Sequence, residues 1–180
     1  MTDTPVMTRE DIDAQHGPHA WTPEKLLDRL QELEINTDTI DHDPMRTVED
    51  SRRLRADLSE DGHCKSLFLR NKKGQMWLVV MLEDQRLDIK ALGQALDQRL
   101  SFAKPDRLMA YLGVIPGSVT PFGVVHDTDQ AVQVVLQKRM MDCALLHYHP
   151  LRNYRTTSIS SADLVAFLRA EAHEPVILDF

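Results

Sequence analysis

Two apolar runs near the middle of the chain constrain the fold more than any other feature. They cover residues 65–70 and 75–82, and the four residues Asn71-Lys72-Lys73-Gly74 separate them. Apolar runs that flank a short turn are typical of paired strands, and Gly74 can adopt the positive φ that such a turn needs. The sequence therefore predicts a β-hairpin whose first strand begins at Lys65.

Helix caps and apolar periodicity predict further elements on both sides of this hairpin. A helix is expected after Thr22, with Pro23 in its first turn, and a final helix after Ser160. The other expected helices cover residues 47–58, 89–96 and 106–112, and the other strands cover 37–44, 100–103, 123–126, 131–136, 144–148, 156–159 and 175–180. Because strands and helices are interspersed and hairpins are common, we expect a mixed α/β (α+β) fold rather than a doubly wound parallel sheet.

The 180 residues fit a single domain over 20–180, preceded by a loose arm over 1–19 that carries no sustained periodicity. No apolar run approaches the roughly 20 residues that a membrane helix needs. The polar N-terminus has no basic segment followed by an apolar one, so we expect a cytoplasmic protein without a secretory signal. Cys64 and Cys143 fit free thiols in a reducing compartment, although a single disulfide remains open.

The charge distribution limits the kinds of partner. The net charge is −7, which argues against a general nucleic-acid binder and against DNA. Residues 44–75 are the exception, with five acidic side chains and eight basic ones: Arg46, Arg52, Arg53, Arg55, Lys65, Arg70, Lys72 and Lys73. This stretch is either a solvated helix face with a hairpin tip or a small contact surface for a polyanion.

Two features suggest an anion or ester site. Lys65 opens an apolar strand, where its ammonium either reaches solvent past a buried stem or serves as a fixed charge in a cleft. The segment GVIPGSVTPFG, residues 113–123, holds three glycines and two prolines. Such a loop is either an ordinary turn or one that aims unpaired N–H groups at an anion or carbonyl oxygen. Ser118 and Thr120 lack the Gly-x-Ser-x-Gly pattern of a serine nucleophile.

The segment CALLHYHPLRNYRTTSIS, residues 143–160, contributes a third group. His147 and His149 share one face of a predicted strand, and Asn153 follows it. Together with Cys143, His126, His63 and Cys64 these histidines allow a zinc site on paper, but their spacing matches no common zinc pattern. The chain also lacks dinucleotide and phosphate-loop motifs, so a hydrolase or a binding module is the default expectation.

Taken together in chain order, these features indicate a protein family more specifically than any one of them does alone. A lysine at the head of a strand, then GSVTP followed by Phe-Gly, then HPLRNYRTTSIS before a final helix, resembles the YbaK-like superfamily of aminoacyl-tRNA deacylases. The resemblance covers roughly residues 22–180. It is closest to the free-standing branch associated with prolyl-tRNA synthetase, whose members are similar to enzymes that remove alanine from tRNA(Pro).

The resemblance implies a fold and a set of roles. The fold is a curved, mostly antiparallel, barrel-like mixed sheet with flanking helices. The activity is hydrolysis of the ester between a misattached amino acid and the 3′ end of tRNA, without a metal or other cofactor and with help from a ribose hydroxyl of the substrate. The resemblance places catalytic roles on Lys65, Gly117 and Pro121, and substrate binding on His149 and Asn153. From the loop itself we expect the backbone N–H groups of Gly117, Ser118 and Val119 to hold the substrate carbonyl or orient the water.

The remaining expectations concern the pocket and the partners. Leu67, Leu69, Phe102 and Phe122 are candidates for a pocket wall that excludes proline by its size. Arg46, Arg52, Arg53, Lys72 and Lys73 are candidates for contact with the acceptor end of tRNA, and prolyl-tRNA synthetase is a candidate protein partner. Two alternatives remain: a non-catalytic module that binds aminoacyl-tRNA or an acidic ligand, and a metal-dependent hydrolase that uses His126, His147, His149 and Cys143.

Overall fold

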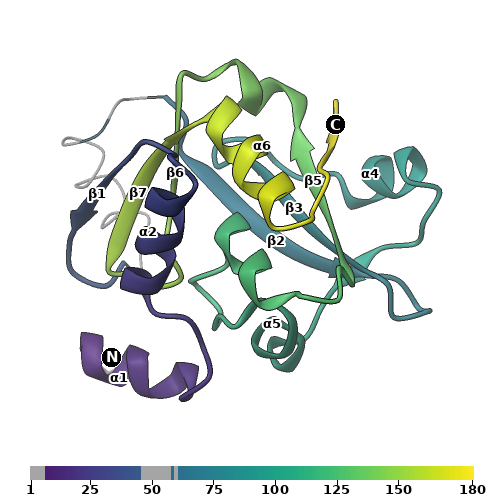
Figure 1. The fold of residues 1–180 in the computed structure, drawn as a ribbon. Helices are drawn as coiled ribbons and strands as arrows, with labels where there is room; N and C mark the ends of the chain where they lie inside the picture. The colour runs from purple at the N-terminus through teal and green to yellow at the C-terminus, as the bar shows by residue number, and fades with distance from the viewer. Residues whose placement is uncertain (1–6, 46–57, 59–60) are drawn as a thin grey trace, which may run out of the picture.

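The structure is a computed structural model that describes residues 7–45, 58 and 61–180, and their strands form two sheets (Figure 1). The smaller sheet is antiparallel, in the order β1 (Thr37–Asp41), β7 (Arg155–Ser160) and β6 (Leu145–Tyr148). The larger sheet has the order β4 (Ser101–Phe102), β2 (Cys64–Arg70), β3 (Met76–Leu82), β5 (Val132–Gln137) and β8 (Val176–Leu178). In it β2 is antiparallel to β3 and β4, whereas β3–β5 and β5–β8 are parallel pairs.

The predicted mixed α/β fold is confirmed, but the described strands do not close into a barrel. A single parallel bridge between His63 and His147 connects the two sheets just before β2 and within β6. The helices are α1 (Arg9–His16), α2 (Pro23–Glu32), α4 (Ile89–Ala95), α5 (Pro105–Leu112) and α6 (Ser161–Ala170), with 3₁₀ helices η1 (Pro121–His126) and η2 (Lys138–Asp142). No described helix is long and apolar enough to span a bilayer.

The central hairpin forms as predicted. Cys64 pairs with Leu82 at one end and Arg70 with Met76 at the other. Gly74 has φ +86°, and the Asn71 side-chain oxygen accepts a hydrogen bond from the N–H of Gln75 at 3.0 Å. The turn is therefore closed both by a residue that tolerates positive φ and by a side chain that stands in for a backbone acceptor.

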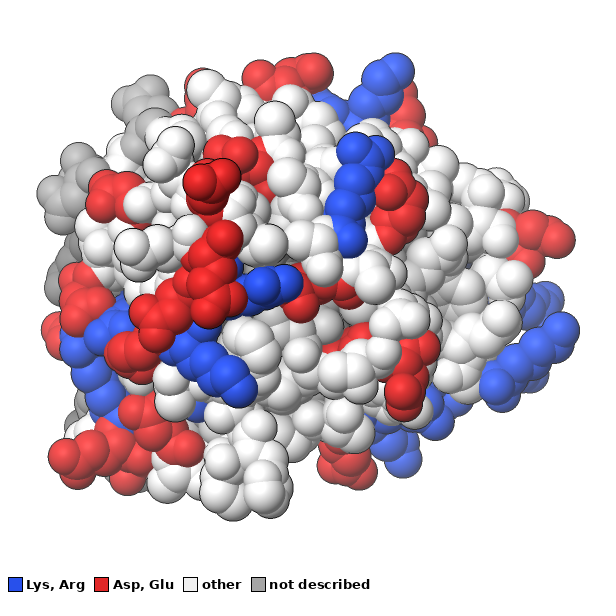
Figure 2. All heavy atoms as spheres, viewed as in Figure 1, with Lys and Arg blue, Asp and Glu red and all other residues white. Residues whose placement is uncertain are grey.

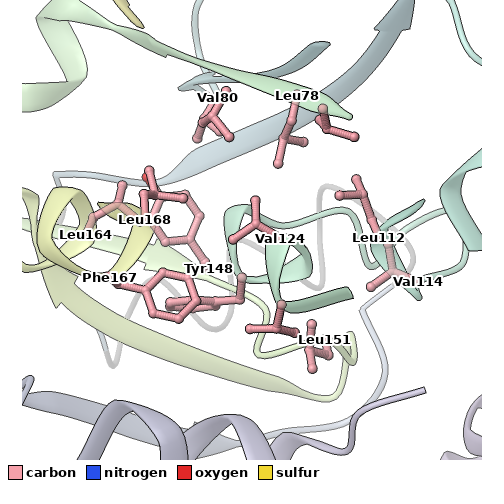
Figure 3. Close-up of a cluster of buried hydrophobic side chains, with 14 of the residues drawn as sticks. Leu78, Val80, Leu112, Val114, Val124, Tyr148, Leu151, Leu164, Phe167 and Leu168 are labelled. Atoms are coloured by element: carbon pink, nitrogen blue, oxygen red, sulfur yellow. The ribbon is translucent and has the colours of Figure 1, made fainter. Parts of the chain in front are cut away.

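Both faces of the hairpin are buried, each under different helices. Phe68, Leu78 and Val80 face the main core, where α5, η1 and α6 cover the larger sheet (Figure 3). Leu69 and Val79 face the opposite side, under α4. Successive side chains of a strand point to opposite faces, so odd and even positions of β2 lie in different environments. This alternation decides which residues of β2 reach the functional site.

The N-terminal segment contains a helix where we predicted only a loose arm. Thr8 caps α1, and its side chain accepts a hydrogen bond from the N–H of Asp11, whose carboxylate accepts from the N–H of Thr8. This reciprocal pair is a capping box, a signal that the short polar segment does contain. Asp13 on α1 then holds the chain segment after β6 through Arg152 at 2.8 Å.

Two predicted elements are not among the helices and strands described above. Residues 123–126 were expected to be a strand but belong to η1, because the Thr120 hydroxyl caps that helix by accepting from the N–H of Phe122. The predicted helix over 47–58 falls, except for Leu58, outside the described residues. The other predicted helices and strands are present with small changes at their ends.

Candidate active site

A small cavity of about 100 Å³ lies where the start of β2, the end of β6 and the loop before η1 meet. The described residues that line it are Met45, Leu58, His63, Cys64, Ser66, Glu83, Val119, His147, Tyr148, His149 and Thr156. A larger hollow of about 660 Å³ adjoins it, and His63 and Glu83 line both. The chain thus brings the predicted GSVTP loop and the HYH strand together around one small space.

His149 has the arrangement of a neutral proton acceptor. It follows β6 directly, at the point where Pro150 prevents the strand from continuing. Its Nδ1 lies 2.9 Å from the carbonyl oxygen of Arg155, which can only accept, so Nδ1 carries the proton. Burial lowers the pKa of His149 below its ordinary value of 6.5. The ring is therefore neutral at pH 7, and its Nε2 has an unprotonated lone pair.

Both the side chain and the backbone of His147 contact neighbouring residues. Its Nδ1 lies 2.8 Å from the Ser158 hydroxyl, and its backbone N–H donates to the carbonyl of Gly62 at 3.0 Å. The rings of His63 and His147 are 4.9 Å apart, and burial together with the His63 charge lowers the pKa of His147. These contacts suit a residue that shapes the wall and connects the two sheets.

The predicted loop contains two backbone N–H groups that are available to an acceptor. Gly117 has φ +88°, a conformation that favours glycine. Val119 lines the cavity, and within the described part of the chain the N–H groups of Gly117 and Val119 have no hydrogen-bond acceptor. The N–H of Ser118 is different, because it donates to the carbonyl of Ile115 at 3.0 Å. Pro121 begins η1 and is buried.

Ser118 and Asn153 contribute buried polar atoms behind this loop. The Ser118 side chain is fully buried and its hydroxyl has no partner, so it is not placed as an exposed nucleophile. Asn153 donates from Nδ2 to the carbonyl of Met45 at 3.2 Å, while its Oδ1 is buried without a partner. A Cβ built on Gly117 would lie 3.9 Å from this Nδ2, so Asn153 supports the loop from behind.

The Lys65 ammonium binds the turn after β3, and Lys65 is not among the residues that line the small cavity. Its Nζ donates to the carbonyl of Glu83 at 3.2 Å and also to the carbonyl of Gln85. Cys64 and Ser66, its neighbours in β2, line the cavity, whereas Lys65 does not. Because side chains alternate along a strand, Lys65 lies on the face opposite to Ser66. It therefore fixes the turn after β3, and its catalytic role stays a prediction.

The predicted pocket wall is also corrected. Leu67 and Leu69 point to the face covered by α4, and Phe102 is 58% exposed on β4. Phe122 is fully buried in the main core, with its ring 5.9 Å from that of Tyr148. The actual wall contains Ser66 and Tyr148 instead. Ser66 could have been found from strand alternation with Phe68, but nothing in the sequence pointed to Glu83.

The predicted tRNA contacts are only partly described. Lys72 and Lys73 are exposed at the tip of the β2–β3 hairpin, roughly 20 Å along the strand from Ser66. Arg46, Arg52 and Arg53 lie outside the described residues. On the face shown in Figure 2, Lys and Arg alternate with Asp and Glu and do not form one continuous basic surface. Contact of these side chains with tRNA stays a prediction.

The residues of the alternative metal site are not gathered together. Nε2 of His126 accepts a hydrogen bond from the N–H of Trp21 at 2.9 Å, away from the cavity. Cys143 lines the larger hollow, whereas His147 and His149 line the smaller cavity. Within the described ranges no group of three or more His, Cys, Asp and Glu side chains is arranged to hold a metal ion.

Comparisons with known proteins give a consistent result. Residues 42–167 match the family described as the aminoacyl-tRNA editing domain. The chain is 37% identical over 165 residues to the prolyl-tRNA editing protein ProX of Acetoanaerobium sticklandii, covering 91% of this chain and 95% of that protein. It is 32% identical over 162 residues to the mouse (Mus musculus) prolyl-tRNA synthetase associated domain-containing protein 1, covering 87% and 95%.

Solved structures share the fold at low sequence identity. A crystal structure described as a proposed trans-editing enzyme for prolyl-tRNA synthetase has a TM-score of 0.70 and 16% identity, covering 87% of this chain and 94% of that one. At this identity the likeness concerns the fold alone.

Proposed function

The chain belongs to the aminoacyl-tRNA editing domain family, and from this premise we propose that it hydrolyses the ester of mischarged tRNA, with Ala-tRNA(Pro) as its substrate. The observation that carries the proposal is the small cavity. Neutral His149 and Val119, whose N–H has no hydrogen-bond acceptor within the described residues, both line it. A proton acceptor beside an oxyanion donor is what ester hydrolysis by water requires.

The residues suggest how the reaction proceeds. Water attacks the carbonyl carbon of the ester and gives a proton to Nε2 of His149, while the N–H groups of Val119 and Gly117 stabilise the developing oxyanion. The bond from this carbon to the ribose oxygen then breaks, and the ribose oxygen takes the proton back from Nε2 of His149. The products are a free amino acid and deacylated tRNA. An aminoacyl ester is already activated, so positioning supplies much of the rate enhancement.

We propose that selectivity is steric. The cavity of about 100 Å³ accommodates the methyl side chain of alanine, and the shape of its walls would exclude the ring of proline. Rejecting a larger group by steric exclusion is effective, whereas discriminating one methylene by binding yields only about 1–3 kcal/mol. The protein would therefore remove alanine and spare correctly charged Pro-tRNA(Pro).

The binding partners remain part of the proposal. The acceptor end of tRNA would reach the cavity, with Arg46, Arg52, Arg53, Lys72 and Lys73 as candidate phosphate contacts. Prolyl-tRNA synthetase is the candidate protein partner because it produces the mischarged substrate, and we place the activity in the cytoplasm.

Deacylation of Ala-, Ser-, Cys- and Pro-tRNA(Pro) by the purified protein tests this function. We expect rapid hydrolysis of Ala-tRNA(Pro), hydrolysis of Pro-tRNA(Pro) at the background rate, and at least about a hundredfold loss on His149→Ala. The matched control is His19→Ala, which removes an exposed histidine that does not line the cavity. Binding of Ala-tRNA(Pro) without hydrolysis would instead support the binding-module alternative. Activity that survives exhaustive chelation would eliminate the metal-dependent one.

A further inference from the structure

Glu83 occupies the boundary between the small cavity and the larger hollow, and it lines both. Its backbone is fixed on two sides. The N–H donates to the carbonyl of His63 at 2.9 Å, and the carbonyl accepts from Nζ of Lys65 at 3.2 Å. The ammonium of Lys65 also binds the carbonyl of Gln85, so it anchors the turn that presents Glu83. A residue held this firmly at a cavity edge can position its side chain reproducibly.

The charge of Glu83 acts on two other residues that line the cavity. Its negative charge counteracts, as a minor effect, the lowering of the pKa of His149 by burial. It also contributes to the raised pKa of Cys64. Both residues line the same small cavity as Glu83. The carboxylate is therefore electrostatically coupled to the atoms around which the ester would be hydrolysed.

The substrate brings a charge that this site must accommodate. An aminoacyl ester has a free α-amino group, and α-amino groups have pKa values near 7.7–8.0, so the group is largely protonated at pH 7. A buried positive charge needs a paired negative one, and it would also hinder any protonation of neighbouring His149. Within the described lining of the small cavity, Glu83 is the acidic residue.

We propose, on the basis of the proposed function, that Glu83 binds the α-ammonium group of the aminoacyl ester. The enzyme then selects esters with a free α-amino group over those whose nitrogen is acylated, because an amide nitrogen has no charge to pair with the carboxylate. Lys65 acts as a positioning residue through the carbonyl of Glu83. Discrimination of alanine from proline stays with the size of the cavity, since both amino groups are charged.

The test compares Ala-tRNA(Pro) with N-acetyl-Ala-tRNA(Pro) on the wild type, Glu83→Gln and Glu83→Asp. The wild type should prefer the free amine. Glu83→Gln should lower kcat/KM on Ala-tRNA(Pro) by about ten- to a hundredfold, as expected for a lost charge-assisted hydrogen bond, and leave N-acetyl-Ala-tRNA(Pro) nearly unchanged. Glu83→Asp, which keeps the charge, should retain more of the preference. Asp84→Asn is the matched control, because Asp84 lines only the larger hollow.

The outcomes separate the two proposals. If the wild-type protein does not hydrolyse Ala-tRNA(Pro) faster than the background rate, the proposed function fails, and the proposed role of Glu83 fails with it. If wild type is active but Glu83→Gln keeps the full preference for the free amine, the role of Glu83 is overturned. An equal loss on both substrates also overturns it, because a merely structural effect would not distinguish them. Circular dichroism and thermal melting of each variant verify that it is folded.

Discussion

Among single residues, Gly117 offers the clearest test of the loop that lines the cavity. Its φ is +88°, which costs a residue with a side chain about 1–2 kcal/mol. An added Cβ would have only an ordinary contact, 3.9 Å from Nδ2 of Asn153, so the penalty is backbone strain and not a clash. We expect Gly117→Ala to lower the free energy of unfolding by about 1 kcal/mol and to reduce deacylation, because the relaxing loop moves the N–H of Val119.

Gly74→Ala is the matched control for this substitution. Gly74 has φ +86°, nearly the same as Gly117, and an added Cβ there would have no neighbour within 4 Å. It lies in the hairpin turn at the far end of β2 from the cavity. Urea unfolding should show a similar loss for both variants, whereas only Gly117→Ala should lose activity. Equal activity of the two variants would refute the role of the loop.

Part of the candidate site was predictable at this scale. Val119 and His149 were predicted from loop composition and motif order, and both line the cavity, whereas Gly117 and the predicted pocket wall are not among its lining residues. The face of β2 that borders the cavity was not predictable. The reason is that Leu67 and Phe68 are both apolar and the hairpin is buried on both faces, so the sequence pattern does not indicate which face borders the cavity.

At the scale of elements, helix α1 holds the segment that carries Asn153. Nε of Arg152, a side chain that is 4% exposed, donates to Asp13 at 2.8 Å, and the Tyr154 hydroxyl donates to the same carboxylate at 2.9 Å. Arg9 of α1 also lies 5.0 Å from the centre of the Tyr154 ring. The helix therefore contacts the residues on either side of Asn153, which links the N-terminal segment to the site.

Removing the Asp13 carboxylate should loosen this connection. Asp13→Ala leaves the buried guanidinium of Arg152 without its carboxylate, and we expect the free energy of unfolding to fall by about 1–3 kcal/mol. The estimate is at the lower end for a buried pair because Asp13 is half exposed. Urea unfolding measures the change. Glu10→Ala, on an exposed position of the same helix, is the control, and a similar loss in both variants would contradict the specific contact.

Helices and strands whose sequence signals lie within a few residues of each other were predicted well. Elements without such signals were not. The hairpin, the Thr22 cap and the Ser160 cap depend on residues within a few positions of each other, and all three are present. Helix α1 was missed because its eight residues bury only Ile12 and His16, too few for a visible period. Helix η1 was taken for a strand because its apolar residues are all buried. A continuous apolar run does not distinguish a helical period from the two-residue period of a strand.

For the whole molecule, the pairing of distant strands was the least predictable feature. The parallel pairs β3–β5 and β5–β8 join segments that are separated by helices, and nothing in either sequence specifies its partner. The resemblance implied a barrel-like sheet, whereas the described strands form two sheets joined by one bridge. The small cavity lies beside this junction, so its position follows from tertiary pairing that no single motif encodes.

The buried histidines give the whole molecule a predicted dependence on pH. Burial lowers the pKa of four histidines below 6.5: His16, His126, His147 and His149. As the pH falls through 6.5, the unfolded chain therefore binds protons before the folded one does, and the free energy of unfolding decreases. The stabilisation is complete above about pH 6.5 and is lost progressively toward the lower pKa values of the folded state.

Thermal unfolding between about pH 7.5 and pH 5 at constant ionic strength measures this effect. Glu24 and Glu174 do not confound it, because their pKa values lie below 4.5 and their contributions are lost only in stronger acid. For Glu24, burial raises the pKa but a backbone hydrogen bond and Arg155 lower it more, and for Glu174 Arg169 lowers it. His16→Gln should reduce the loss of melting temperature, since His16 is buried and its Nε2 has no partner, whereas exposed His19→Gln should leave it unchanged. A melting temperature that stays constant over this range would show that the four rings are not kept neutral by burial. The reasoning that makes Nε2 of His149 a proton acceptor at neutral pH would then fail as well.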